Sequence, residues 1–375
     1  MLKYLASVAA AMFALWPLSV GAAPAWEQWQ SVGGVYDLGG PRSDGSLLVA
    51  GSAALYTLTP AGSITAFGAG YHDDAGAEAY LAVSPGLQGG GCAFARDDTF
   101  VLRLHAPVGI TRVSADGTET GPFANVAAPS LNGIAFDNVG LFSRDLLVTG
   151  PVNGKTEVVG IDCSGNVHVV TMAAPVVEGG IAVAPQSFGS FGGDLIAPDE
   201  LSGLIWAIAP DGSARQVVNS GLPHGGDIGV ESVAFVPSGF TSRGGYVYYS
   251  DRATPNNPHP GTDHVLRLSS ADLVAAGVQD GDMLAATEGG ASMIDVRCVT
   301  TCEVTQVVAT PTTGHGEGHL AYTLNPLPSP TSRPTLIPSR AARTSVSGPV
   351  VALVVTILVV LAAVMIAVTV SRRQR

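Results

Sequence analysis

The sequence predicts an all-β protein, a six-bladed β-propeller followed by a single C-terminal transmembrane helix. Three observations lead to this prediction. Short apolar strands and tight turns recur at a period of about 45–55 residues, as in propellers. The chain is rich in turn-forming residues, with 47 Gly and 25 Pro among 375 residues, and its last part holds one long uncharged stretch. With 46% hydrophobic and 13% charged residues, a disordered chain and a coiled coil are excluded.

Residues 1–22 are typical of a secretory signal peptide. Lys3 provides the positive n-region, Leu5 to Leu15 is a short apolar stretch, and Val20-Gly21-Ala22 is a small-residue cleavage site. The apolar stretch is too short to favour an uncleaved membrane anchor. We therefore expect residues 23–325, the predicted propeller, to lie outside the cytoplasm.

The C-terminal part predicts a membrane tether. Residues 326–348 are rich in Pro, Ser and Thr and contain no acid, which indicates an extended stalk. Residues 349–370 are uncharged and long enough to span a bilayer, and 371–375 form a basic cytoplasmic tail. A sorting signal removed by a processing enzyme is the alternative. Since no clean LPxTG-type motif is found, we expect a permanent single-pass anchor in the cell membrane.

The net charge of the predicted propeller disfavours some classes of binding partner. Without Lys3 and the six arginines beyond Asn325, 11 basic residues face all 30 acids, a net charge of −19. So acidic a surface disfavours nucleic acid and anionic lipids and suits cations or neutral molecules. The expected partners are therefore the membrane, through the C-terminal helix, and a small molecule or surface protein at the propeller mouth. We expect a monomer.

Each repeat begins with a short apolar strand that carries a small residue near its centre. The five examples are Leu81-Ala82-Val83, Ile134-Ala135-Phe136, Ile181-Ala182-Val183, Val233-Ala234-Phe235 and Leu320-Ala321-Tyr322. Three further strands complete a unit, which gives units near 35–70, 78–126, 131–172, 177–223, 229–290 and 291–324. The first and last units can share a blade and close the ring. Five or seven blades and a β-sandwich are the alternatives, and residues 270–277 predict a helical insert.

The four cysteines predict two disulfides in an oxidising compartment. Cys298 and Cys302 are spaced to close a small loop, for which a zinc site is the weaker alternative. Cys92 opens the second strand of its unit, and Cys163 lies in the third-to-fourth turn of the next. Since both places lie on one face of a propeller in adjacent blades, we expect a Cys92–Cys163 bridge.

Polar residues recur just before the innermost strands, whose starts meet at one mouth of a propeller. These residues are Glu78, Asn132, Glu178, Glu231 and Glu317. Hard oxygen ligands that converge from several strands suit Ca²⁺, so the sequence predicts a divalent-cation site at this mouth. Solvated turn residues around a wide mouth are the alternative.

The segments Asn132-Gly133-Ile134-Ala135-Phe136 and Pro210-Asp211-Gly212 resemble the six-bladed gluconolactonase and paraoxonase-like propellers. The resemblance implies a divalent ion in the channel that activates lactones, esters or phosphoesters. It also implies that Asn132 and one of Glu78 or Glu231 are ligands. The sequence departs from the family at Gly179, where a second Asn is expected.

A second candidate cluster is the alternating run His315, Glu317 and His319. On a strand-like segment these side chains share one face, where they can bind Zn²⁺ or act as acid and base. This run is similar to the His and Glu arrangement of streptogramin lyase-type propellers, and a glycine-rich loop with exposed histidines is the alternative. His224 and Asp251 are weaker catalytic candidates at the same mouth, and Asp251 also fits a turn.

Two classes of function follow from these patterns. The first is a membrane-tethered, divalent-metal-dependent hydrolase of a lactone or ester. The second is a non-catalytic propeller that binds a ligand or another surface protein through the same mouth. The fold does not distinguish them, because propellers serve both roles.

Overall fold

The computed structural model describes residues 24–72, 78–89, 91–308 and 312–327. The predicted signal peptide, the membrane span and the tail lie outside the described residues, as does the stalk apart from its first two residues. The chain divides into two compact units, residues 1–326 and 327–375, and the architecture below is that of the first. No helix among the described residues is long and apolar enough to cross a membrane.

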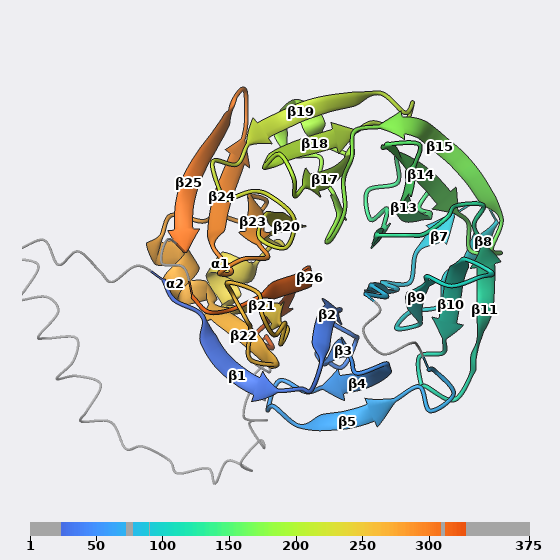
Figure 1. Cartoon of the computed structure of the whole chain (residues 1–375), viewed down its shortest axis with the longest axis horizontal. Coiled ribbons are helices and arrows are strands. Elements are labelled where there is room, and N and C mark those ends of the chain that lie inside the picture. The colour runs from blue at the N-terminus through green and yellow to red at the C-terminus, as the bar shows by residue number, and fades with distance from the viewer. Residues whose placement is uncertain (1–23, 73–77, 90, 309–311, 328–375) are drawn as a thin grey trace, which may run out of the picture. The chain divides into compact units, whose positions relative to one another are not determined.

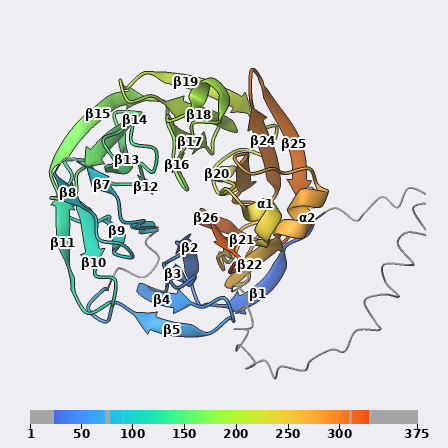
Figure 2. The same cartoon turned by 180° about the vertical axis from the view of Figure 1, so that it is seen from behind.

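Six four-stranded antiparallel sheets stand around a central channel like the blades of a propeller (Figures 1 and 2). The six-bladed fold predicted from the sequence is therefore confirmed. In the first four blades the strands follow chain order from the channel outward. Blade 1 is β2 (Val35–Gly39), β3 (Leu47–Gly51), β4 (Ala54–Leu58) and β5 (Ile64–Phe67); blade 2 is β6 (Leu81–Val83), β9 (Thr99–Arg103), β10 (Gly109–Val113) and β11 (Thr120–Asn125); blade 3 is β12 (Gly133–Phe136), β13 (Leu146–Val152), β14 (Lys155–Ile161) and β15 (Val167–Ala174); blade 4 is β16 (Ala182–Val183), β17 (Leu195–Asp199), β18 (Leu204–Ile208) and β19 (Ala214–Asn219).

Blades 5 and 6 are interleaved in the sequence. Their strands, from the channel outward, are β20 (Val230–Phe235), β23 (Met283–Thr287), β24 (Met293–Cys298) and β25 (Cys302–Val308) in blade 5, and β26 (Gly316–Leu324), β21 (Gly245–Asp251), β22 (His264–Ser269) and β1 (Glu27–Ser31) in blade 6. The β21–β22 hairpin thus leaves blade 5 after its first strand and forms the middle of blade 6. The predicted unit boundaries 229–290 and 291–324 are therefore wrong, because the local strand pattern does not reveal which sheet a hairpin joins.

Short elements connect these strands. Helices α1 (Phe240–Arg243) and α2 (Ser270–Ala275) flank the inserted hairpin, a 3₁₀ turn η1 (Gly189–Phe191) precedes β17, and β7 (Gln88–Gly89) pairs with β8 (Cys92–Ala93). Helix α2 confirms the predicted helical insert. Its N-cap is Ser269, whose side chain accepts a hydrogen bond from the backbone N–H of Asp272.

The N-terminal strand closes the ring. Strand β1 pairs antiparallel with β22, so the first and last described strands share blade 6, whereas the predicted first unit, 35–70, forms a complete blade of its own and does not share one with the last unit. The rings of Trp26 and Trp29 lie 6.1 and 5.3 Å from those of Tyr249 and Tyr248. The guanidinium of Arg267 stacks 4.8 Å from the ring of Trp29. Aromatic packing therefore reinforces a closure that otherwise depends on one strand pair.

The core lies between neighbouring blades, where the faces of successive sheets pack together. Phe94, Phe100 and Phe136 meet edge to face across blades 2 and 3, with ring centroids 5.0–5.6 Å apart. Near the axis the sheets converge and leave little room, which explains the small residue in each repeat. At Gly39, the counterpart in blade 1, an added Cβ would lie 2.2 Å from Cδ1 of Leu81.

Both predicted disulfides are present. Cys92–Cys163 joins the small hairpin of blade 2 to the β14–β15 turn of blade 3, with Cα atoms 5.8 Å apart. Cys298–Cys302 closes the turn between β24 and β25. Since both sulfurs of that pair are in a disulfide, the alternative of a zinc site at Cys298 and Cys302 is excluded.

Candidate metal and acid–base site

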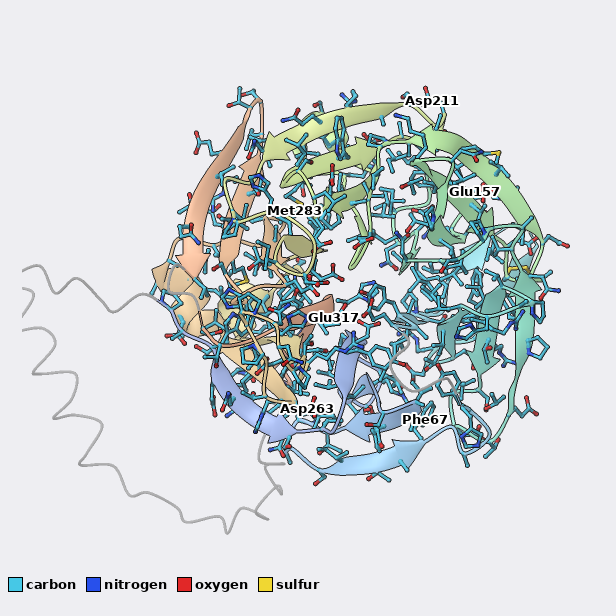
Figure 3. All side chains as sticks on the ribbon, viewed as in Figure 1. Phe67, Glu157, Asp211, Asp263, Met283 and Glu317 are labelled. Carbon is cyan, nitrogen blue, oxygen red and sulfur yellow. A yellow bond between two sulfur atoms is a disulfide. The ribbon has the colours of Figure 1, made fainter. Side chains whose placement is uncertain are left out.

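The predicted carboxylates gather at one mouth of the channel. Inner strands begin there and their antiparallel neighbours end there, so polar residues from both strand ends meet. We call this cluster the acidic mouth, and its members are Glu78, Glu178, Glu200, Glu231, Glu288, Glu317 and Arg252. Side-chain oxygens crowd the central region around Glu317 (Figure 3). Asn132 adjoins the cluster: its Nδ2 donates to the carbonyl oxygen of Val177, next to Glu178, at 3.0 Å, so all five predicted metal ligands lie at this mouth.

Four residues of the site are missing from the sequence analysis. Glu200, Arg252 and Glu288 each follow directly after the second strand of a blade, namely β17, β21 and β23. Polar residues directly after second strands therefore mark the same mouth as polar residues at the starts of inner strands. This second pattern is visible in the sequence and identifies all three residues. Tyr80 precedes β6 by one residue and shows no distinguishing sequence signal.

Tyr80 links two buried carboxyls. Its hydroxyl oxygen lies 2.8 Å from Oε1 of Glu231 and 2.6 Å from Oε1 of Glu317. One hydroxyl proton serves only one of these contacts, so a second proton must lie on one of the carboxyls. Burial, followed by repulsion from neighbouring carboxylates, raises the pKa of both Glu231 and Glu317 well above its ordinary value. This trio therefore stores an exchangeable proton.

A second row of carboxyls runs Glu178–Glu200–Glu288, with hydrogen bonds between successive side chains. Two carboxyls bond in this way only when one is protonated. Burial raises the pKa of each to about 7, and the neighbouring carboxyls contribute. At neutral pH the row is therefore partly protonated, as a proton donor and acceptor for catalysis needs to be.

His315, Glu288 and Glu317 form a group with the geometry of metal ligands. Nε2 of His315 lies 2.9 Å from Oε1 of Glu288 and 4.0 Å from Oε2 of Glu317. One ligand atom from each residue lies within 4.8 Å of the others, and all three residues are buried. Ligands about 2.1 Å from a common ion are about 3 to 3.5 Å apart. The observed separations, from 2.9 Å to at most 4.8 Å, lie on either side of this spacing, so the three side chains are close enough together to hold one divalent ion.

The protein holds His315 in a suitable state for such a role. Burial and, next, the charge of Arg252 lower the pKa of His315, which favours the neutral imidazole with a free lone pair. Its backbone N–H donates to Oδ1 of Asp251 at 2.8 Å, and Oδ2 of Asp251 accepts from the hydroxyl of Thr262. Asp251 is buried and positions the start of β26.

Arg252 brings a positive charge to the cluster. Its Nη1 pairs with Oε1 of Glu78 and lies 3.3 Å from Oε2 of Glu317. Glu78 is exposed and comes from blade 2, whereas Arg252 and Glu317 belong to blade 6. The guanidinium thus ties the two sides of the mouth together.

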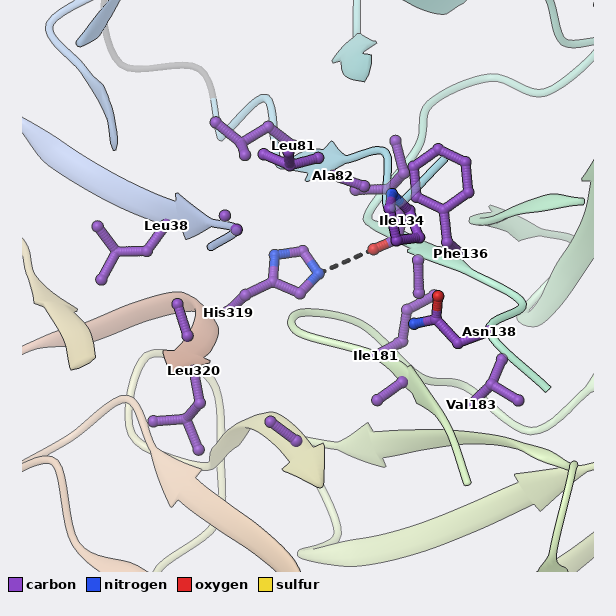
Figure 4. Close-up of a pocket in the computed structure, with 18 of the residues that line it drawn as sticks. Leu38, Leu81, Ala82, Ile134, Phe136, Asn138, Ile181, Val183, His319 and Leu320 are labelled. Atoms are coloured by element: carbon purple, nitrogen blue, oxygen red, sulfur yellow. Dashed lines mark hydrogen bonds between the residues drawn. The ribbon is translucent and has the colours of Figure 1, made fainter. Parts of the chain in front are cut away.

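His319 lies apart from His315 and Glu317. Gly318 adopts a φ of +66°, so the regular alternation stops and the expected shared face of the three side chains is not formed. Nδ1 of His319 lies 2.9 Å from Oδ1 of Asp37, and Nε2 lies 2.8 Å from the carbonyl oxygen of Ile134 (Figure 4).

The hydrogen bonds of His319 define its charge. A carbonyl oxygen only accepts, so Nε2 carries a proton. Asp37 accepts from the backbone N–H groups of Leu38, Leu81 and His319, so Nδ1 of His319 also donates to a carboxyl oxygen that acts as an acceptor. Burial opposes the charged ring, but Asp37 outweighs it and raises the pKa of His319. His319 is therefore a partly buried imidazolium that joins blade 6 to blades 1 and 3.

His224 lies at the rim. Its ring is exposed, and Nδ1 is 3.5 Å from the carbonyl oxygen of Leu222. The backbone N–H of Gly225 donates to the carbonyl of Glu200 at 2.9 Å, which fixes this loop at the edge of the acidic mouth. No hydrogen bond or ion pair in the described structure joins His224 to Glu288, His315 or Glu317.

A cavity of about 440 Å³ adjoins the acidic mouth between blades 2 and 3. Glu78 and Glu178 of the acidic mouth line this cavity. Tyr80, which is bonded to Glu231 and Glu317, lines it as well. Leu104 and Val176 form part of an apolar wall, and Lys155 also lines the cavity. The mouth therefore combines ionisable groups with room for an apolar body.

Comparisons with known proteins find similar folds but no related sequence. No protein-family model matches the sequence, and no curated protein does either. Solved structures with a similar fold include a nidogen/laminin complex (11% identity, 77% of this chain and 85% of that chain, TM-score 0.47) and a streptogramin B lyase (13%, 80% and 95%, 0.44). A putative TolB from Agrobacterium tumefaciens is similar as well (12%, 79% and 91%, 0.43). Likenesses this distant carry no argument about function.

Proposed function

We propose that the protein is a divalent-metal-dependent hydrolase of a small lactone or ester, acting at the acidic mouth. The observation that carries this proposal is the buried trio of Glu288, His315 and Glu317, whose ligand atoms lie within 4.8 Å of one another. This metal-ligand group is continuous with two sets of side chains that share protons: Glu317 belongs to the set with Tyr80 and Glu231, and Glu288 belongs to the set with Glu178 and Glu200. An ion site, nearby acids and bases, and an adjoining cavity are the parts that metal-assisted hydrolysis needs.

The residues of this chain have separable roles in such a reaction. A bound ion would polarise the substrate carbonyl and lower the pKa of water. Glu178 or Glu200, with a pKa of about 7, accepts a proton from the attacking water. The proton shared by Glu231 and Tyr80 passes to the leaving oxygen. The proton taken up by Glu178 or Glu200 is then released to solvent, and Glu231 takes one up from solvent, which restores the site. In sum, the hydroxyl of one water joins the acyl carbon, the acyl C–O bond breaks, the leaving oxygen gains the proton from Glu231, and the second proton of the water replaces it.

The ligand set bears on the identity of the ion. Carboxylates alone favour Ca²⁺, the ion expected from the sequence. An imidazole nitrogen beside two carboxylates suits Zn²⁺ or Mn²⁺ as well. The proposal therefore names a divalent ion, and Ca²⁺, Mn²⁺ and Zn²⁺ are the ions to compare.

The test begins with metal content. We expect one equivalent of a divalent ion in the purified protein, a lower melting temperature after chelation, and hydrolysis of some members of a lactone and aryl-ester panel that returns with one of the three ions. Glu288→Gln should lose both ion and activity. Asp194→Asn, a buried acid of blade 4 outside the acidic mouth, is the matched control and should keep both. An ion-free protein that gains no thermal stability from any of the three ions would contradict the proposal.

The alternative function is non-catalytic binding of a ligand or surface protein. The row Glu178–Glu200–Glu288 favours it, since its carboxyls already satisfy one another by sharing protons. A cationic ligand that displaces those protons would bind at the same mouth. Stoichiometric ion binding without turnover of any panel substrate would support this function over hydrolysis.

We also propose that the propeller is tethered to the cell membrane by residues 349–370 and lies outside the cytoplasm. Both disulfides support an oxidising compartment. Fractionation of cells followed by protease treatment of intact cells tests this: the protein should sediment with membranes and be accessible from outside. Recovery in the soluble cytoplasmic fraction would contradict it.

A further inference from the structure

The channel has a second cavity at the end opposite the acidic mouth. It measures about 390 Å³, within the usual size range of small-molecule sites, about 300–1,000 Å³. Every blade contributes to it through its inner strand, and Figure 4 shows Leu38, Leu81, Ile134, Val183 and Leu320 around it. The wall is therefore formed largely by the inner strands of the six blades.

The two cavities are separated by a layer of paired side chains. His319 lines the second cavity, and its ring meets that of Tyr80 edge to face with centroids 6.0 Å apart. Tyr80 lines the cavity beside the acidic mouth. Because His319 is bonded through both ring nitrogens, it forms a fixed floor. A ligand at one end would therefore not reach the other.

The charge of the second cavity is opposite to that of the acidic mouth. Its lining contains no Asp or Glu among the described residues. The lining residues are glycines or have apolar side chains, except for Arg96, Asn138 and His319. Arg96 and Asn138 are exposed and come from the loops that follow the inner strands of blades 2 and 3. The neighbouring carboxylate of Asp97 is bonded to the backbone N–H and hydroxyl of Ser43. A cationic, acid-free cavity is unexpected in a propeller with a net charge of −19.

From this contrast we propose that the second cavity binds a small monoanion with an apolar body, such as an aliphatic or aromatic carboxylate or sulfonate. The apolar body lies against the inner strands, where its burial supplies most of the affinity. The anionic group lies at the open end and pairs with the guanidinium of Arg96. The imidazolium of His319 is neutralised by Asp37 and favours the anion less.

A pair of dyes tests this site directly. 1-Anilinonaphthalene-8-sulfonate is an apolar-bodied anion, and N-phenyl-1-naphthylamine has the same body without the charge. We expect one equivalent of the sulfonate to bind, and Arg96→Gln to weaken it about tenfold, the size of one charge-assisted contact. The same substitution should leave the neutral dye almost unchanged. Asn138→Trp, which places a large side chain at the open end, should weaken both dyes.

Two controls keep the test specific. Arg243→Gln removes a positive charge from exposed helix α1, outside the cavity lining, and should change neither affinity. Glu288→Gln should also leave sulfonate binding unchanged, so the outcome does not depend on the metal site. Melting temperatures near that of the wild type show that each variant is folded, and both Arg96 and Asn138 are exposed. Equal sulfonate affinity in the wild type and Arg96→Gln would overturn the proposal, as would equal losses in Arg96→Gln and Arg243→Gln.

Discussion

Buried acids lie at both ends of the second strands of the blades, in opposite circumstances. At the end where these strands begin, an aspartate directly precedes each of four strands; these are Asp98 before β9, Asp145 before β13, Asp194 before β17 and Asp282 before β23. At the other end, Glu200 and Glu288 follow β17 and β23 directly. The same two strands therefore carry an acid at each end.

The aspartates are part of the blade structure. Asp98, Asp194 and Asp282 pair with Arg112, Arg215 and Arg297 on outer strands, with N–O distances of 2.5, 2.9 and 2.6 Å. The backbone carbonyl of each aspartate also accepts the N–H of a residue that follows the inner strand, at 2.8–2.9 Å. Each of these three acids has an arginine within reach, although burial still raises the pKa of Asp194.

The glutamates lack such partners. No lysine or arginine is bonded to the described side chains of Glu178, Glu200 or Glu288, which share protons instead. Acids that are buried to a similar extent therefore differ in whether an arginine within reach stabilises their charged form. Unpaired buried acids cost stability, and a fold that keeps several of them together is typical of a functional site.

The largest expected effect concerns ion binding. His315→Asn should weaken the binding of a divalent ion about 100-fold or more, because it removes one of three ligands. Asp282→Asn, at the opposite strand ends, should leave ion affinity within about twofold. Titration against a chromophoric chelator measures both variants. Similar losses in the two would show that the acidic mouth is not the ion site.

The second prediction compares stability in the absence of an ion. Asp282→Asn should lower the free energy of unfolding by about 1–3 kcal/mol, since it breaks charge-assisted hydrogen bonds to Arg297. Glu288→Gln should be neutral or stabilising at pH 8, because it removes a buried negative charge to which no lysine or arginine is bonded among the described residues. Urea unfolding with chelator present gives both values. If the two substitutions destabilise equally, the difference between the two strand ends is not electrostatic.

The third prediction is a pH dependence. The folded protein raises the pKa of Glu178, Glu200 and Glu288 from 4.5 to about 7, so it binds protons more tightly than the unfolded chain. This contribution to stability is fully present below about pH 4.5 and is lost as the pH rises through 7. The melting temperature of ion-free protein should therefore fall between pH 5 and pH 8. The double variant Glu178→Gln/Glu200→Gln should show a shallower fall, and a rise in the wild type would contradict the assignment.

The smallest expected effect concerns blade 3. Its Asp145 faces a half-exposed His168, with Nδ1 3.6 Å from Oδ2, where other blades have an arginine. An arginine carries a full charge at every accessible pH and reaches a carboxylate with two N–H groups, so His168→Arg should stabilise the protein by about 0.5 kcal/mol in urea unfolding. High salt should reduce the gain, because salt screens an exposed ion pair. A gain that is independent of salt would point to packing instead of charge.

The sequence by itself determined the features that repeat locally. The recurring inner strands, such as Ile134-Ala135-Phe136, predicted a propeller of six blades, because each such strand begins a new four-stranded unit. The Cys92–Cys163 disulfide follows from the same order of strands, and the Cys298–Cys302 disulfide follows from the short spacing of its cysteines. The starts of the inner strands identified four carboxylates of the acidic mouth and the adjoining Asn132, since equivalent positions in successive blades meet at one end of the channel.

Only the tertiary structure decided the features that depend on partners far apart in the chain. The β21–β22 hairpin has the pattern of any hairpin, and its place in blade 6 depends on ring closure, with Trp26 and Trp29 packed on its tyrosines. The left-handed backbone at Gly318 directs His319 to Asp37 of blade 1 and leaves His315 beside Glu288 of blade 5. A local pattern specifies a strand, but the free energy that selects its neighbours comes from long-range packing and from the pairing of buried charges.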